Sequence, residues 1–323
     1  IHLGGGSTGN SLLLSQACLG RITGRGTANL LVIEGGANDS FSFADTGWSY
    51  AGIVNGSYHE YRKGGQIVQV HESVRHEITG TGAADDNLIS RTSTTHIEAG
   101  AGADIITVFA GFNNASGIIT GADFGSIDGG AGNDTLRIGD SGASLNLSGL
   151  GGGKITGVEI IDLAASGGSN TLSLDADSIA DMGLTELTVK GDVSDSLVLD
   201  GAWEFDGTHY VCGSSKLKVE GAAAVTIDGD NSTPILLEGD WIFIDGKFTD
   251  GSRVVNVTNC PEVQISGNIG PVVLEGVWSN SATGEFTSSG GLKVVVDPAS
   301  VVQVSGSCSL AIYGGTGADS LDA

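Results

Sequence analysis

Short apolar runs separated by glycine-rich and polar turns follow one another along most of the chain. Val, Ile, Leu and Thr dominate the runs, while Gly, Asn, Asp and Ser fill the turns, a pattern that predicts short β-strands. Large apolar residues recur every nine positions at Leu88, Ile97 and Ile106, and again, after a phase shift, at Ile127 and Leu136. Because the repeats are short and tandem, the pattern predicts an all-β, parallel and elongated β-solenoid rather than a sandwich.

The turns in this region carry the motif G-G-x-G-x-D-x-U-x, in which U is a large apolar residue. Residues 129–137 and 314–322 are complete copies, residues 99–107 begin with Ala instead of Gly, and residues 79–88 hold a degenerate copy. The glycines permit tight turns that bring carbonyl oxygens inward, and the aspartate supplies a hard anionic oxygen suited to Ca²⁺.

The aspartate spacing predicts how such turns would share an ion. Asp86 and Asp104 are 18 residues apart, which places them on the same side of successive turns if two nonapeptides make one turn. One loop cannot supply the roughly six to eight oxygens that Ca²⁺ takes, whereas stacked loops can.

A longer duplication runs through the chain at an offset of 160 residues. Residues 1–14 resemble residues 161–174, and after a slip of four residues 31–41 resemble 187–197. Helix is predicted only around residues 175–182 and at the counterpart near residues 15–19, each of one or two turns.

The four tryptophans fall at equivalent places in this longer repeat. Trp48 and Trp203 correspond in the two copies, and Trp241 and Trp278 begin similar segments. A turn and a β-rich return follow each one. Two interpretations stand: an aromatic platform for sugars, or a side chain that fills the core of its own rung, which one Trp per module favours.

Composition narrows the classes of partner. The chain has 14 Lys and Arg against 38 Asp and Glu, for a formal charge of -24. This balance argues against nucleic acid and anionic membrane surfaces and favours relief of self-repulsion by bound cations. No apolar run reaches the length of a membrane helix. The chain opens at Ile1 without a signal peptide, which favours a fragment or processed product.

The nonapeptides resemble those of RTX proteins, a family of secreted bacterial proteins with calcium-binding repeats. The longer module is similar to modules of large RTX-type surface proteins and adhesins. The resemblance implies type I secretion, folding outside the cell where calcium is abundant, and Ca²⁺ as the cofactor. On that analogy Asp104, Asp134 and Asp319 are side-chain ligands, and Asp86 (or Asp85) is a further candidate. The backbone carbonyls that would complete the shell lie near Gly100, Gly102, Gly130, Gly132, Gly315 and Gly317.

Two features depart from that family. RTX proteins usually avoid cysteine, yet this chain has four. The nonapeptide run is interrupted by residues 109–126, which affects how many ions a roll can hold. The predicted organisation is a Trp-bearing module at 1–78, a calcium-binding β-roll at 79–147, a second Trp-bearing module at 148–230, two shorter Trp-bearing rungs at 231–311, and the start of a further nonapeptide at 312–323.

No catalytic constellation stands out, and we expect no enzyme. Residues 5–9 match G-x-S-x-G, but the corresponding segment of the second copy lacks the pattern and no helix is expected after it. His59, His71 and His76 form a loose group beside glutamates, for which a metal or acid-base role stays open. Cysteine pairing also stays open, because no C-x-x-C spacing is present.

Two functional hypotheses follow. The first is a calcium-stabilised structural segment of a secreted or cell-surface protein: an adhesin stalk, a surface-layer subunit or an extracellular filament, associating with itself or with surface proteins and glycans. The alternative is a glycan-binding or glycan-modifying β-helix, which would require carboxylates and basic residues together on one face.

Overall fold

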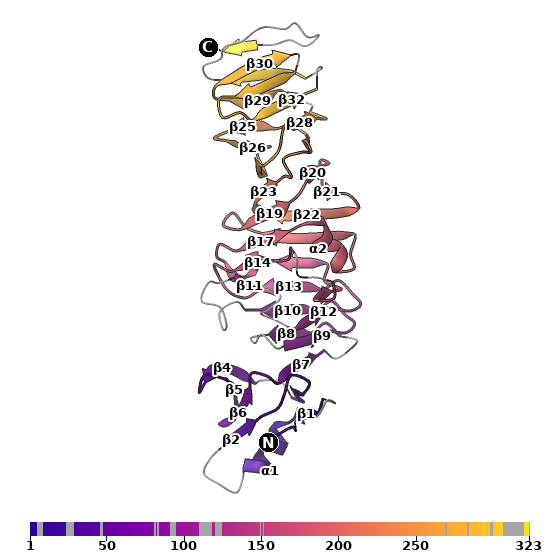
Figure 1. Cartoon of the computed structure of the whole chain (residues 1–323), viewed down its shortest axis with the longest axis vertical. Helices are drawn as coiled ribbons and strands as arrows, with labels where there is room; N and C mark the ends of the chain where they lie inside the picture. The colour runs from indigo at the N-terminus through magenta and orange to yellow at the C-terminus, as the bar shows by residue number, and fades with distance from the viewer. Residues whose placement is uncertain are drawn as a thin grey trace. The chain divides into compact units, whose positions relative to one another are not determined.

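The structure is a computed structural model in which strands make up nearly all of the regular structure (Figure 1). It describes the chain except residues 5–8, 24–28, 46–47, 81, 83, 91–94, 110–117, 120–124, 149, 151, 269, 283, 298–299, 306–319 and 323. Two compact units are present: Ile1–Ser144 with Leu150–Ile160, and Leu145–Gly149 with Ile161–Ala323. Most strands pair in parallel with strands one turn away, so the predicted all-β parallel β-solenoid is confirmed. We call one turn a rung.

The first unit contains three strand ladders. The first, all parallel, consists of β1 (Ser11–Leu14), β3 (Ser40–Phe43), β7 (Arg75–Thr79), β9 (Thr95–Glu98), β12 (Ser126–Asp128) and β15 (Ile155–Thr156). The second consists of β8 (Asn87–Ser90), β10 (Ile105–Val108) and β13 (Thr135–Ile138). The third consists of β2 (Leu30–Ile33), β6 (Gln66–His71), β5 (Tyr58–Lys63) and β4 (Ser49–Val54), and β11 is Ile118–Ile119.

The apolar residues of the nine-residue pattern form columns across these ladders. Ile106 pairs in register with Leu88 on one side and with Leu136 on the other. Ile97 pairs in the same way with Ile127 in the first ladder. The rung between Leu88 and Ile106 is 18 residues long, as in the predicted roll, whereas the interruption after β10 lengthens the next one.

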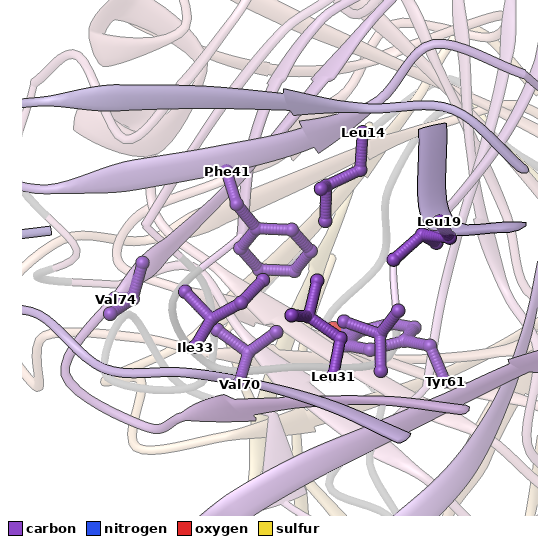
Figure 2. Packing of buried hydrophobic residues seen from close by; sticks show 9 residues of the cluster. Leu14, Leu19, Leu31, Ile33, Phe41, Tyr61, Val70 and Val74 are labelled. Atoms are coloured by element: carbon purple, nitrogen blue, oxygen red, sulfur yellow. The ribbon is translucent and has the colours of Figure 1, made fainter. Parts of the chain in front are cut away.

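The core of the first unit is an apolar cluster between the first and third ladders (Figure 2). Leu14 and Phe41 enter it from β1 and β3, and Ile33 and Val70 enter from β2 and β6. Leu19 adds the buried face of helix α1 (Gln16–Thr23). Each fully buried side chain of this kind contributes roughly 1.5–3 kcal/mol of transfer free energy.

The second unit continues the parallel pattern, and β14 (Ser144–Asn146) and β16 (Ile160–Asp162) lie at the division between the units. One ladder is β17 (Thr171–Leu174), β19 (Ser196–Asp200), β23 (Ala224–Asp228) and β27 (Val254–Thr258). The other parallel sets are β18 (Glu186–Gly191) with β22 (Ser215–Gly221), β24 (Ile235–Glu238) with β28 (Val263–Ser266) and β32 (Lys293–Val296), and β29 (Val272–Glu275) with β33 (Val302–Ser305) and β34 (Ser320–Asp322).

Among the residues that the structure describes, four three-strand arms interrupt the parallel stacking, and each begins at a tryptophan. In an arm the first strand is followed by an antiparallel second strand and then by a third strand that pairs in parallel with an earlier strand of the solenoid. The arms are β4–β5–β6 after Trp48, β20 (Glu204–Phe205)–β21 (Tyr210–Cys212)–β22 after Trp203, β25 (Ile242–Ile244)–β26 (Lys247–Thr249)–β27 after Trp241, and β30 (Trp278–Ala282)–β31 (Glu285–Ser288)–β32 from Trp278. This fits the turn and β-rich return that the sequence predicts after each Trp. The first strands β20 and β25 also pair in parallel with the later strands β24 and β29.

The long duplication is visible as one repeated set of hydrogen bonds. The Asn10 amide N–H donates to Asp39 Oδ1 at 2.9 Å, and the Asn170 N–H donates to Asp195 Oδ1 at the same distance. The side-chain amides of Asn10 and Asn170 each donate to the carbonyl seven residues earlier. The two copies therefore share local geometry, although the five-part division of the chain stays a prediction.

The helices form where the sequence predicts them. Helix α2 (Ala176–Asp181) begins at Asp175, whose carboxylate accepts the Ser178 N–H at 2.7 Å, while the Ser178 hydroxyl bonds the Asp175 backbone in a capping box. A 3₁₀ turn, Ala164–Ser166, is the additional short helix in the second unit. Within the described residues, none of the helices has the length and apolar character needed to span a membrane.

Candidate metal centre

Three glycine-rich turns of the first unit stack directly on one another. The first includes the described residues 80, 82 and 84–86, and the other two occupy residues 99–104 and 129–134, each just before a strand of the second ladder. The Ala131 N–H donates to the Gly100 carbonyl at 2.8 Å, and the Gly102 N–H donates to the Ala131 carbonyl at 3.0 Å. The turns that the nonapeptide motif predicts are thus neighbours in adjacent rungs.

Glycine is required where these turns approach most closely. Gly130 and Gly132 have φ values of +89° and +154°. A Cβ atom would lie 2.0 Å from the Gly100 oxygen in the first case and 1.6 Å from the Gly102 oxygen in the second. Any side chain there would push the rungs apart, which gives these motif positions a structural reason beyond turn formation.

The motif aspartates form a column in which each rung is bonded to the next. Asp104 Oδ1 accepts the Asp86 N–H at 2.7 Å, and Asp134 Oδ1 accepts the Asp104 N–H at 2.8 Å. Glu159 Oε2 accepts the Asp134 N–H at 2.8 Å. Asp86 and Asp104 therefore stack in successive rungs, as their 18-residue spacing predicts. Asp85 lies beside the column, and its Oδ1 accepts the Ala103 N–H at 2.8 Å.

Glu159 is the member of this column that the sequence did not reveal. It is not preceded by a glycine nonapeptide, so the motif does not include it. The available signal was the alternation Glu159-x-Ile161-x-Leu163, which matches Asp134-x-Leu136 and places an acid immediately before a strand.

The two central aspartates are buried and incompletely bonded. Asp104 and Asp134 have no exposed surface. Their Oδ2 atoms are buried and lack a hydrogen-bond partner within the described part of the chain. A buried, unpaired carboxylate oxygen costs several kcal/mol on general grounds unless a proton or cation compensates it.

Two other buried aspartates show what full bonding looks like. Asp39 Oδ2 accepts the Gly36 N–H, and Asp195 Oδ2 accepts the Asp192 N–H, both at 2.8 Å and from three residues earlier. At Asp134 the equivalent N–H belongs to Ala131 and is directed to the neighbouring rung instead. In the glycine-rich turn, the second carboxylate oxygen of Asp134 therefore receives no hydrogen bond from the Ala131 N–H.

Electrostatics at the column also favour a positive ligand. Burial raises the pKa of Asp134, and the negative charges of Asp104, Glu159 and Asp128 raise that pKa further, against a lowering by the Asp104 N–H bond. The mutual repulsion of these carboxylates disfavours their charged forms unless positive charge is present, and Ca²⁺ is a hard cation that accepts carboxylate oxygens in flexible geometry.

The side chains alone do not form a ready metal cage. Among the described residues, no three His, Cys, Asp or Glu side chains converge as a metal site. A bound ion would need the carbonyl oxygens near Gly100, Gly102, Gly130 and Gly132, and two of the neighbouring carbonyls already accept N–H bonds between rungs. The proposed ligand set therefore stays a prediction, as does the copy with Asp319, Gly315 and Gly317, which lies outside the described residues.

The three grouped histidines interact electrostatically, His71 with His59 and His59 with His76, and each also bonds a neighbouring hydroxyl. His59 Nδ1 pairs with the Tyr50 hydroxyl at 2.9 Å, His76 Nδ1 with the Tyr61 hydroxyl at 3.3 Å, and His71 Nδ1 with Ser73. The G-x-S-x-G segment falls mostly outside the described residues. Cys18, Cys212 and Cys260 are free thiols. The fourth cysteine, Cys308, lies outside the described residues.

Comparison with known proteins identifies no relative of this chain. No family model, curated protein or solved structure matches the chain. The site must therefore be interpreted from its own chemistry.

Proposed function

We propose that this chain is a calcium-stabilised structural segment of a secreted or cell-surface bacterial protein. The observation that carries the proposal is the pair of buried Oδ2 atoms on Asp104 and Asp134, which lack partners within the described residues and sit in an acidic column. A divalent cation would supply the missing positive charge between stacked turns.

Calcium suits this column better than other common metals. The oxygen donors near it are carboxylates and backbone carbonyls, which are the ligands Ca²⁺ takes in its irregular shells, whereas Mg²⁺ demands a stricter octahedron. Because the ligands come from different rungs, binding the ion would join rungs that otherwise repel, and folding would be linked to calcium concentration.

The role that follows is mechanical rather than catalytic. A solenoid stiffened by calcium would serve as an adhesin stalk, a surface-layer subunit or a filament, exported unfolded and folded outside the cell. The formal charge of -24 disfavours nucleic acid as a partner and favours association through cations, through a second copy of the chain, or through surface proteins and glycans.

The test is thermal unfolding of the full chain in calcium and in EDTA. Calcium at about 100 times its Kd should add roughly 2.7 kcal/mol to the unfolding free energy and raise the melting temperature. Asp104→Asn and Asp134→Asn should each reduce this gain, because the amide removes the charge that holds the ion.

Asp195→Asn is the matched control. Asp195 is equally buried, but both of its oxygens are bonded, so this variant should lower stability while keeping the full calcium response. Equal melting temperatures in calcium and EDTA for the unmodified chain would contradict the proposal. So would an identical calcium response in Asp134→Asn and the unmodified chain.

A further inference from the structure

Trp48 differs from the three tryptophans that open the other arms. Trp203, Trp241 and Trp278 are fully buried, and each indole N–H donates to the backbone carbonyl three residues earlier. Trp48 is half-buried, and its N–H donates to the carboxylate of Asp45 at 3.1 Å. The core-filling role therefore fits three of the four tryptophans and leaves Trp48 with part of its ring in solvent.

Trp48 lines a pocket of about 430 Å³ in the first unit. The walls come from different parts of the fold: Phe43 from β3, Tyr50 from β4, Tyr61 from β5 and His76 from β7. Ser49 and Ile89 complete the lining. The volume lies within the ordinary range for small-ligand pockets, roughly 300–1,000 Å³.

The aromatic walls hold each other in place. Phe43 stacks on Trp48 with ring centroids 4.4 Å apart, and Tyr61 meets both Phe43 and Tyr50 edge-on at 5.3 and 5.4 Å. Lys63 contacts Asp45 at 3.1 Å, on the same carboxylate that orients the Trp48 indole. Because Tyr61 also belongs to the buried cluster, the pocket is anchored to the core (Figure 2). A ligand would meet a preformed surface.

The lining is uncharged at neutral pH. None of the described lining residues is Asp, Glu, Lys or Arg. Burial lowers the pKa of His76 to about 3, so its imidazole is neutral. Polar atoms are nevertheless present in the hydroxyls of Ser49, Tyr50 and Tyr61. An anionic ligand would find no counter-ion in this lining and would be repelled by the formal charge of -24.

We propose that this pocket binds a neutral pyranose unit of a glycan. A pyranose is amphipathic: its C–H groups pack on the electron-rich faces of aromatic rings, and its hydroxyl rim pairs with hydroxyl and imidazole groups. The hydroxyls of Ser49, Tyr50 and Tyr61 already bond the Arg62 carbonyl, His59 and His76, and a hydroxyl can take part in a further hydrogen bond. A purely aromatic ligand would stack equally well but would use none of this remaining capacity. The proposal is independent of the calcium column, because it uses other residues.

The test is saturation-transfer NMR and calorimetry on the full chain in calcium, with methyl glycosides of glucose, galactose, mannose and N-acetylglucosamine. At least one should bind, and Trp48→Ala should weaken binding by about tenfold or more. Ile89→Glu provides a second variant, because this exposed wall residue can change without disturbing the core, and its new charge should also abolish binding.

Tyr58→Ala is the matched control. Tyr58 lies on β5 with Tyr61 but outside the pocket, with its hydroxyl bonded to Glu34, so the variant should bind the sugar normally. Three results would overturn the proposal. These are no binding of any neutral glycoside, binding unchanged in Ile89→Glu, and a preference for glucuronate or for a nucleobase over the neutral sugars.

Discussion

At the scale of single residues, two kinds of buried aspartate differ by one hydrogen bond. Asp39 and Asp195 use both carboxylate oxygens on backbone N–H groups, whereas Asp104 and Asp134 use one within the described residues. Both kinds precede a strand and bond the neighbouring rung. The same position in the fold therefore either bonds backbone N–H groups through both oxygens or keeps one oxygen without a partner among the described residues, according to the turn before it.

His76 makes the stability of the first unit depend on pH. Its ring stacks on Phe41 at 4.5 Å, bonds the Tyr61 hydroxyl and is repelled by His59 when charged. Burial, the larger cause, lowers its pKa to about 3, while a histidine in the unfolded chain titrates near about 6.5. The unfolded state then binds more protons, so stability is lost as pH falls from about 6.5 toward 3.

His76→Phe should remove this component. Relative to the variant, the unmodified chain should lose up to about 1.4 kcal/mol of unfolding free energy per pH unit across that window. Urea unfolding over a pH series measures both slopes. Parallel slopes for His76→Phe and the unmodified chain would show the assignment to be wrong.

The sequence predicted the stacking of Asp86 on Asp104 because residue spacing alone fixes that geometry. It did not reveal Glu159, because the acid reaches the column without a glycine motif and from 25 residues beyond Asp134. It also could not separate Trp48 from the other tryptophans, since burial depends on what the neighbouring rung places over the ring.

At the scale of elements, the three-strand arm is the recurring unit. In the second unit, Trp241 meets Phe205 of the preceding arm edge-on at 5.7 Å, and Trp278 meets Phe243 at 5.1 Å. Each arm is thus packed against the next by one Trp and one Phe. The sequence predicted these strands but not their direction, because side chains alternate with the same period of two in parallel and antiparallel strands.

Truncation of an arm tryptophan should reveal this packing. Trp241→Ala should cost roughly 3–5 kcal/mol, because it empties a fully buried site, and should shift the urea midpoint followed by circular dichroism. Trp48→Ala should cost less, since its ring is already half exposed. A larger midpoint shift for Trp48→Ala than for Trp241→Ala would contradict the burial difference.

At the scale of the whole chain, the excess of negative charge is the main feature of the composition. Only 14 basic residues offset 38 acidic ones, so folding brings many like charges together. That part of the chemistry follows from composition alone. The division into two units does not follow from composition. The duplication starts its second copy at residue 161, but it gives no sign that Leu150–Ile160 belongs to the first unit while Leu145–Gly149 belongs to the second.

Salt and calcium should therefore stabilise the chain to different extents. In EDTA, raising sodium chloride should increase the melting temperature, because screening weakens repulsion beyond about 10 Å. Calcium should add a further increase that magnesium at equal ionic strength does not reproduce. Matching curves for the two divalent ions would mean that screening alone accounts for the effect.

The hairpin turns of the arms can change in length without changing the register of the strands in the solenoid. At Asp245 and Gly246, with φ of +51° and +78°, the chain reverses in two residues between β25 and β26. Residues inserted there would lengthen the turn without shifting either flanking strand, because β25 keeps its register with β29 and β27 keeps its register with β23. The sequence and length of the hairpin turns can therefore vary while the strand ladders stay the same. This makes the turns natural positions for diversification and for engineered epitopes.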